Sequence, residues 1–206
     1  GLIQNRACRI VTYGRNAGSW WRLGAVTIDP PWTFFEAVYQ GEVFGAFKTK
    51  LVGEHNLLNA LSVVAAAHLL GIAPRVVAGA LETFEGIKRR QEVRGKKNGI
   101  TVMDDFAHHP TAVKETIRAV KPFYPHGRLV AVFEPRTNSS MRKVFQNVYP
   151  LAFDQADLIC IRRPSRIDKI PPDERFSSQK LVDDLKSCGK EAHFFADTEA
   201  IIAFLV

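Results

Sequence analysis

The stretch Leu129-Val130-Ala131-Val132-Phe133 is an unbroken apolar run, and the polar residues Glu134-Pro135-Arg136 follow it at once. Such a run is typical of a strand buried on both faces of a parallel sheet. Further short apolar runs surround it, and a helical pattern follows each. We expect strands at residues 100–103, 129–133, 158–161 and 193–195, and helices at residues 111–120, 140–153, 177–188 and from 198 onward. This alternation predicts an α/β fold with right-handed crossovers and a mainly parallel sheet.

The first part of the chain has a different pattern. Apolar and aromatic runs alternate with turn residues, which predicts a β meander with strands over residues 8–13, 24–28, 33–39 and 43–50. Gln40-Gly41-Glu42 has the composition of a hairpin turn, because glycine tolerates positive φ. Pro30-Pro31 must lie in a connection, since proline cannot donate to a sheet ladder.

Two helices are expected after the meander. Apolar residues recur at helical spacing over residues 56–70, and Gly71 ends that helix. A second helix is expected over residues 74–83, because Pro74 is a favoured first-turn residue.

Residues 84–94 are polar and basic and show no periodicity, which predicts a linker. We therefore expect two domains, residues 1–84 and 85–206. The chain has no initiating methionine, and its last residues, 201–206, are apolar and lack a helix stop signal. We expect a piece of a longer protein, cut near the end of its second domain.

The charge of the chain favours anionic partners. Its 206 residues include 28 Lys and Arg against 21 Asp and Glu, a formal net charge of +7. The basic residues form short clusters at residues 88–90, 94–97 and 162–166. Such clusters are typical either of local anion pockets or of a solvated basic face.

The sequence excludes two other classes of protein. The longest apolar stretch, residues 57–72, is interrupted by Asn59, Ser62 and His68, so we expect no membrane partner. The cysteines number 3 and lie far apart, which excludes a disulfide framework and a clustered zinc site. A reducing, cytoplasmic location fits best.

Polar residues follow two of the predicted strands. Asp104-Asp105-Phe106-Ala107-His108-His109-Pro110 follows the first, and residues 134–140 follow the second. In an open parallel sheet, ligands bind beyond the carboxyl ends of the strands. The carboxylates and imidazoles can hold a sugar hydroxyl pair, a metal ion or a proton in transit. Alternatively, Asp105 caps the next helix and one histidine satisfies a buried carbonyl.

Two further pairs are candidate ligands. Arg136, with Asn138 close behind, can grip a carboxylate through a planar fork, although a surface ion pair is the alternative. Asn56 and Asn59 lie three residues apart and share a helix face, so their amides can bind a heterocycle edge. Helix capping is the alternative for Asn56. The chain contains no phosphate loop, no Gly-x-Gly-x-x-Gly fingerprint and no Gly-x-Ser-x-Gly elbow.

Three motifs in register resemble the Mur ligase family over essentially the whole chain. They are Gly53-Glu54-His55-Asn56-x-x-Asn59, Phe84-x-Gly86-Ile87-Lys88-Arg89-Arg90 and the segment from Asp104 to Pro110. Within the family, Phe133-Glu134-Pro135-Arg136 and the residues after His109 are most similar to ligases that join UDP-N-acetylmuramate to L-alanyl-γ-D-glutamyl-meso-diaminopimelate. Ligases that add L-alanine are the alternative, and the sequence departs from their typical motifs at two places.

The resemblance implies an ATP-dependent amide ligase of peptidoglycan biosynthesis and recycling. In such ligases the carboxylate of UDP-N-acetylmuramate takes the γ-phosphoryl group of ATP, and the acceptor amine attacks the acyl phosphate. Residues 1–84 would be the distal part of the central ATP-binding domain, and residues 85–206 most of a Rossmann-like third domain. The chain alone would be inactive.

The resemblance also implies roles for residues on the nucleotide side. Asn56 and Asn59 would contact adenine, Arg90 the ATP phosphates and Asp105 the ribose hydroxyls. ATP and Mg²⁺ are the expected cofactors. The phosphate loop and the magnesium ligands are expected outside this chain, so we assign no metal ligand within it.

On the acceptor side, the resemblance places His108, Arg136 and Asn138 toward the incoming tripeptide, with His108 as the catalytic candidate. Two alternatives come from other classes of protein. A nucleic-acid-binding module would use residues 94–97 and the loop arginines, but no clustered aromatic stacking platform or basic arm accompanies the charge, so we expect no nucleic-acid partner. A metallohydrolase would use His108 and His109, but further ligands are missing from the pattern.

Overall fold

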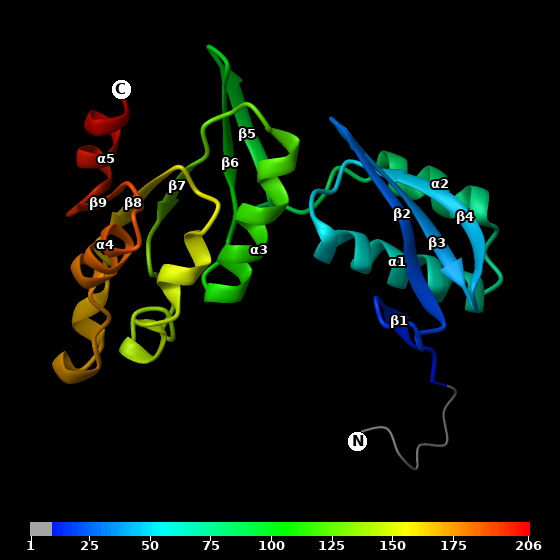
Figure 1. Cartoon of the computed structure of the whole chain (residues 1–206), viewed down its shortest axis with the longest axis horizontal. Coiled ribbons are helices and arrows are strands. Elements are labelled where there is room, and N and C mark those ends of the chain that lie inside the picture. Colours follow the sequence, from blue (N-terminus) through cyan, green and yellow to red (C-terminus); the bar gives the residue numbers. More distant parts are fainter. Residues whose placement is uncertain (1–9) are drawn as a thin grey trace. The chain divides into compact units, whose positions relative to one another are not determined.

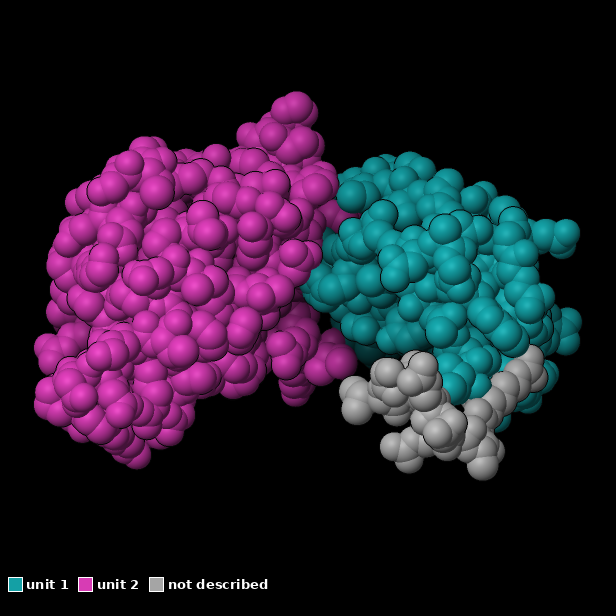
Figure 2. Space-filling model, turned by 60° about the horizontal axis from the view of Figure 1, so that its bottom comes forward, with its two compact units in different colours: residues 1–86 teal, residues 87–206 magenta. Residues whose placement is uncertain are grey.

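The computed structural model describes residues 10–206, which form two compact units. Unit 1 ends at Gly86 and unit 2 runs from Ile87 to Val206, as Figure 2 shows in two colours. Each unit has its own hydrophobic core.

Unit 1 contains a four-stranded sheet with the order β1-β2-β3-β4. Its strands are β1 (Tyr13–Gly14), β2 (Trp21–Asp29), β3 (Trp32–Tyr39) and β4 (Glu42–Thr49). β1 is parallel to β2 and the other pairs are antiparallel, which confirms three strands of the predicted meander. Residues 8 and 9 of the predicted first strand lie outside the described residues, and only Tyr13 of its remainder is in a strand.

Two of the connections in this sheet lie where the sequence predicts them. Gln40 and Gly41 have φ of 51° and 97° and form a two-residue turn, so that Glu42 already belongs to β4. Pro30-Pro31 joins β2 to β3.

Helices α1 (Glu54–Leu69) and α2 (Pro74–Thr83) complete unit 1 (Figure 1). Both predicted helices are confirmed, although α1 begins two residues earlier than the pattern indicates. Gly71, with φ of 71°, follows α1 in the left-handed conformation that glycine adopts at low cost. Both helices share one core with buried sheet residues; its largest members are Trp21, Phe35, Phe47, Leu57 and Leu61.

Unit 2 contains the predicted parallel sheet, which confirms the α/β fold. Its strands, in the order β7-β8-β9, are β7 (Val130–Phe133), β8 (Leu158–Arg162) and β9 (Ala192–Phe195). The helices are α3 (Pro110–Val120), α4 (Ser178–Ser187) and α5 (Thr198–Leu205), with short 3₁₀ segments at Lys121–Phe123, Ile167–Lys169 and Pro172–Glu174. Residues of α3, α4 and the sheet form the main core.

The strand predicted at residues 100–103 pairs differently from the prediction. β6 (Ile100–Asp104) runs antiparallel to β5 (Glu92–Lys97) in a separate two-stranded sheet. Asn98 and Gly99 have φ of 50° and 77° and form the turn between them. The Asn-Gly dipeptide is a strong hairpin signal, and it overrides the polar composition that indicated a linker through residue 94.

The predicted helix over residues 140–153 is also wrong. The structure has two 3₁₀ segments there, η2 (Lys143–Phe145) and η3 (Tyr149–Phe153). Pro150 lacks the amide hydrogen that a continuous helix would direct to the carbonyl of Gln146, and its ring would clash there.

β7 is not buried on both faces. Phe133 is 7% exposed, whereas Val130 and Val132 are 39% and 56% exposed. On that second face, α5 covers Leu158 and Cys160 of β8 through Ile201. Among residues 10–206, no helix has the length and apolar character that a membrane span requires.

Candidate functional site

Asp105 ties together the loop that follows β6. Its carboxylate accepts hydrogen bonds from the backbone N–H of Gln91 (3.0 Å) and of Ala107 (2.6 Å). The hydroxyl of Thr116 on α3 lies 3.4 Å from the same carboxylate. Asp105 therefore does not cap α3.

A cationic and aromatic cluster lies beside this carboxylate. The guanidinium carbons of Arg89 and Arg90 are 4.8 Å and 5.9 Å from the centre of the Phe106 ring, within cation–π range. The Phe106 N–H also donates to the Arg89 carbonyl at 2.9 Å. Arg90 remains exposed. No role was predicted for Arg89 or Phe106 from the sequence. The signal that could have indicated one is Phe106 itself, an aromatic residue among polar residues of the loop.

The two adjacent histidines have different surroundings. His109 is the residue that caps α3, since its Nδ1 accepts from the Thr111 N–H at 3.3 Å. The His108 ring packs edge-on against Phe106, and its Nδ1 lies 3.0 Å from the Phe106 carbonyl oxygen, which is not buried.

Tyr149 on η3 connects this loop to the end of β7. Its hydroxyl donates to the His108 carbonyl, and its ring packs 5.1 Å from that of Phe133 and 5.4 Å from that of Phe176. Tyr149 is fully buried, and this burial raises the pKa of its hydroxyl well above the ordinary value. Tyr149 is thus a neutral donor that the sequence analysis missed, because it lies inside the segment predicted as a helix.

The loop after β7 presents Arg136 to solvent. Arg136 is exposed and has no ion-pair partner among residues 10–206. Asn138 is engaged, because its Oδ1 accepts from the Arg142 Nε at 2.8 Å, and Arg142 also pairs with Glu174. The structure therefore leaves Arg136, but not the Asn138 oxygen, free for a ligand.

Glu134, at the carboxyl end of β7, joins two loops. It accepts from the Arg162 guanidinium at 2.8 Å and from the Ser165 backbone N–H at 3.1 Å. Burial raises the pKa of Glu134, but these hydrogen bonds and the Arg162 charge outweigh burial, so the pKa lies below its ordinary value. Glu134 is an ionised structural link near neutral pH.

The asparagine pair lies on the first turns of α1. The N-cap of α1 is Gly53, with φ of 92°, so Asn56 is not a cap. The Asn56 side-chain amide donates to the Val52 carbonyl at 2.9 Å. Asn59 is exposed. Its amide is open to a ligand, whereas the Asn56 amide already has a backbone partner.

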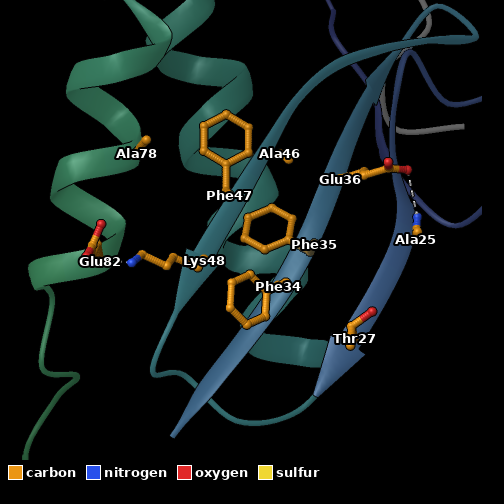
Figure 3. A pocket seen from close by; sticks show the side chains of 10 residues that line it. All are labelled: Ala25, Thr27, Phe34, Phe35, Glu36, Ala46, Phe47, Lys48, Ala78 and Glu82. Carbon is orange, nitrogen blue, oxygen red and sulfur yellow. Dashed lines mark hydrogen bonds and ion pairs between the residues drawn. The ribbon is translucent and has the colours of Figure 1, made fainter. Parts of the chain in front are cut away.

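A separate groove lies in unit 1 and contains none of these residues. Figure 3 shows its walls, with the rings of Phe34, Phe35 and Phe47 on the sheet and the Lys48–Glu82 ion pair (2.7 Å) toward α2. It is an open groove of about 450 Å³. It lacks histidine, cysteine and any unpaired cation, so we do not place the site there. Across the described part of the chain, no three His, Cys, Asp or Glu side chains are grouped to hold a metal ion.

Comparisons with known proteins identify similar chains. Residues 89–206 match the family described as Mur ligase, glutamate ligase domain. The chain is 36% identical to the UDP-N-acetylmuramate–L-alanine ligase of Caldanaerobacter subterraneus, over 99% of this chain and 44% of that protein. It is 33% identical to the UDP-N-acetylmuramate–L-alanyl-γ-D-glutamyl-meso-2,6-diaminoheptandioate ligase of Escherichia coli, over 90% of this chain and 38% of that protein.

A solved structure, UDP-N-acetylmuramate–alanine ligase from Thermotoga maritima, superposes with a TM-score of 0.76 at 26% identity, covering 91% of this chain and 39% of that one. The chain thus spans less than half the length of these relatives. Because the family match extends over more than half of its residues, the chain belongs to the Mur ligase family.

Proposed function

We propose that this chain supplies part of the nucleotide site and the acceptor site of an ATP-dependent ligase that acts on UDP-N-acetylmuramate in the cytoplasm. Residues 1–84 would belong to the central ATP-binding domain and residues 85–206 to the C-terminal domain. The activity would require the remainder of a longer enzyme. Family membership and the names of the relatives support this proposal.

The observation that carries the nucleotide half is the hydrogen bond from Gln91 to Asp105. Gln91 directly follows Arg90. The bond therefore holds the backbone next to Arg90, the proposed phosphate ligand, beside Asp105, the proposed ribose ligand. A carboxylate offers about four lone-pair sites, and Asp105 uses three of them. One acceptor site remains for a ribose hydroxyl.

The acceptor half rests on Arg136 and His108. The free guanidinium of Arg136 suits an acceptor carboxylate, because its planar fork binds carboxylates with two parallel hydrogen bonds. His108 would orient the acceptor, and the Tyr149 hydroxyl holds the His108 backbone in place. Asn138 would act indirectly, through its hydrogen bond with Arg142.

Magnesium would be held elsewhere in such an enzyme. Mg²⁺ is usually bound through one or two carboxylates together with substrate phosphates, and the resemblance to the family implies that those carboxylates lie outside this chain. When bound with ATP, Mg²⁺ would neutralise phosphate charge. This chain's own residues would bind and orient the nucleotide and exclude water from the acyl phosphate.

Two acceptors are candidates, L-alanine and the tripeptide L-alanyl-γ-D-glutamyl-meso-diaminopimelate. The names of most relatives favour L-alanine, while the Escherichia coli relative acts on the tripeptide. The tripeptide carries several carboxylates, and the exposed, unpaired arginines after β7 and β8 favour it. L-alanine is the first acceptor to test and the tripeptide is the second.

Two measurements test the proposal. In NMR spectra of the whole chain, Mg-ATP should shift the amide signals of Gln91 and Ala107, and Asp105→Asn should remove the shift. Asp173→Asn, a matched change at an exposed acid on another loop, should leave it intact. In a chimera, the chain replaces the matching segment of the Caldanaerobacter ligase, which should then release phosphate only with ATP, UDP-N-acetylmuramate and an acceptor. Unchanged amides together with an inactive, folded chimera would overturn the proposal.

A further inference from the structure

Three exposed arginines lie on the loops that follow two neighbouring strands of the parallel sheet. Arg136 lies on the loop after β7, and Arg163 and Arg166 lie on the loop after β8. Among residues 10–206, none of the three has an ion-pair or hydrogen-bond partner for its guanidinium. Because β7 and β8 are adjacent and parallel, both loops leave the sheet at the same end.

The two loops are joined at their bases. Glu134 on the first loop accepts from both Arg162 and Ser165 on the second. The Arg163 N–H donates to the Phe195 carbonyl at 2.8 Å, which attaches the second loop to the end of β9. Arg163 therefore starts from backbone that is held on two sides.

The loops are also joined farther out. Met141 packs with Ile167 and Ile170 in a small buried cluster, and each of these residues is at most 8% exposed. The Phe176 N–H donates to the Met141 carbonyl at 2.9 Å. Arg166 directly precedes Ile167, so its backbone is held beside this cluster.

The charges on these loops do not balance locally. Arg142, Arg162 and Arg175 each have a carboxylate partner, namely Glu174, Glu134 and Asp168. Asp173 is the one further acid of residues 134–146 and 163–176, and the same residues carry three unpaired arginines and two lysines, Lys143 and Lys169. A surplus of cations on loops held in place favours an anionic ligand.

We infer that Arg163 and Arg166 form a second anion subsite, which binds a further carboxylate of an acceptor whose first carboxylate binds Arg136. One bidentate arginine satisfies one carboxylate. L-alanine has a single carboxylate and would leave this subsite empty, whereas an acidic peptide extends to it. The inference rests on the proposed function and deepens it, because it makes these two arginines determinants of acceptor choice.

NMR of the whole chain with labelled arginine tests the inference. The probes are L-alanyl-γ-D-glutamyl-meso-diaminopimelate and L-alanine, each titrated at constant ionic strength. The tripeptide should shift the side-chain Nε–H signals of Arg136, Arg163 and Arg166, and L-alanine only that of Arg136. Arg163→Ala and Arg166→Ala should each weaken tripeptide binding about three- to tenfold and leave L-alanine binding unchanged. Arg75→Ala, at an exposed arginine of α2, is the matched control and should change neither.

The outcomes separate the inference from the proposed function. If the tripeptide leaves the Arg163 and Arg166 signals unchanged, or if L-alanine shifts them equally, the subsite is overturned, and Mg-ATP shifts at Gln91 would still support the ligase. In the active chimera, the two substitutions should raise the KM for the tripeptide with little change in kcat. An equal loss with both acceptors would indicate a general structural role and contradict the inference.

Discussion

The loop after β6 and the loops after β7 and β8 use their charged residues in opposite ways. Asp105 has three hydrogen-bond partners within the protein, whereas Arg136 has none among residues 10–206. The difference follows from the backbone nearby. The backbone N–H groups of Gln91 and Ala107 need an acceptor, and Asp105 supplies it. Near Arg136, Glu134 accepts from the Ser165 N–H instead. A charged residue after a strand can therefore bond mainly to the protein's own backbone, or it can stay unpaired and available to a ligand. The backbone groups around it determine which of the two occurs.

Among the substitutions considered, we expect the largest loss of stability at Tyr149. Tyr149→Ala removes a fully buried ring beneath both loops and should lower the free energy of unfolding by about 3–5 kcal/mol. Tyr149→Phe keeps the packing and deletes only the hydrogen bond to His108, at about 1–2 kcal/mol. Urea unfolding of both variants measures the effects. Equal losses would show that the hydroxyl, and not the ring, holds the loops.

Asp105→Asn should have the next largest effect. The substitution removes the charge that strengthens the bonds from Gln91 and Ala107, at a cost of about 1–3 kcal/mol. Amide hydrogen exchange at Gln91 and Ala107 should accelerate. Exchange in β8 should accelerate only as far as the loss in the free energy of global unfolding requires. Unchanged exchange at the two amides would mean that Asp105 is not part of the scaffold.

Glu134 gives a prediction on pH. Its pKa is lowered in the folded state, so its contribution to stability is present above the unfolded pKa and is lost as the pH falls through the folded one. Glu134→Gln should cost about 1 kcal/mol at pH 7, and the difference between variant and wild type should shrink as the pH falls below about 4. A pH-independent difference in urea midpoints would contradict this assignment.

The smallest effect on stability is expected at Arg136. Arg136→Ala removes an exposed side chain without a partner and should change the free energy of unfolding by less than about 0.5 kcal/mol. Acceptor affinity should nevertheless fall. Urea unfolding checks the first expectation and acceptor titration checks the second. A large loss of stability would move Arg136 from the ligand group to the scaffold.

Periodicity predicted those elements whose pattern is local. Residues 74–83 form α2 as expected, and the runs at residues 158–161 and 193–195 lie in parallel strands. It failed where one or two residues outweigh a pattern, as Pro150 does in the expected helix and as Asn98-Gly99 does by pairing the end of the expected linker into a hairpin. Burial of β7 on both faces could not be inferred, because an apolar run does not show whether a partner covers it.

The candidate site was only partly accessible from sequence for a related reason. The motif order identifies Arg90, Asp105 and Arg136 as candidates, and their roles remain proposals. Long-range contacts decide which polar atoms are free, and no spacing rule reports that Arg142 takes the Asn138 oxygen or that Tyr149 reaches His108. Residue type indicates candidates, and tertiary hydrogen bonds select among them.

The hairpin of β5 and β6 is closed at its root by two long-range hydrogen bonds, from Gln91 to Asp105 and from Phe106 to Arg89. Its tip at Asn98-Gly99 lies about 15–20 Å away along the strands. Because the tip is remote from the proposed nucleotide ligands at the root, it is a natural attachment point for a fluorescent or affinity label that reports on the chain without altering what it binds.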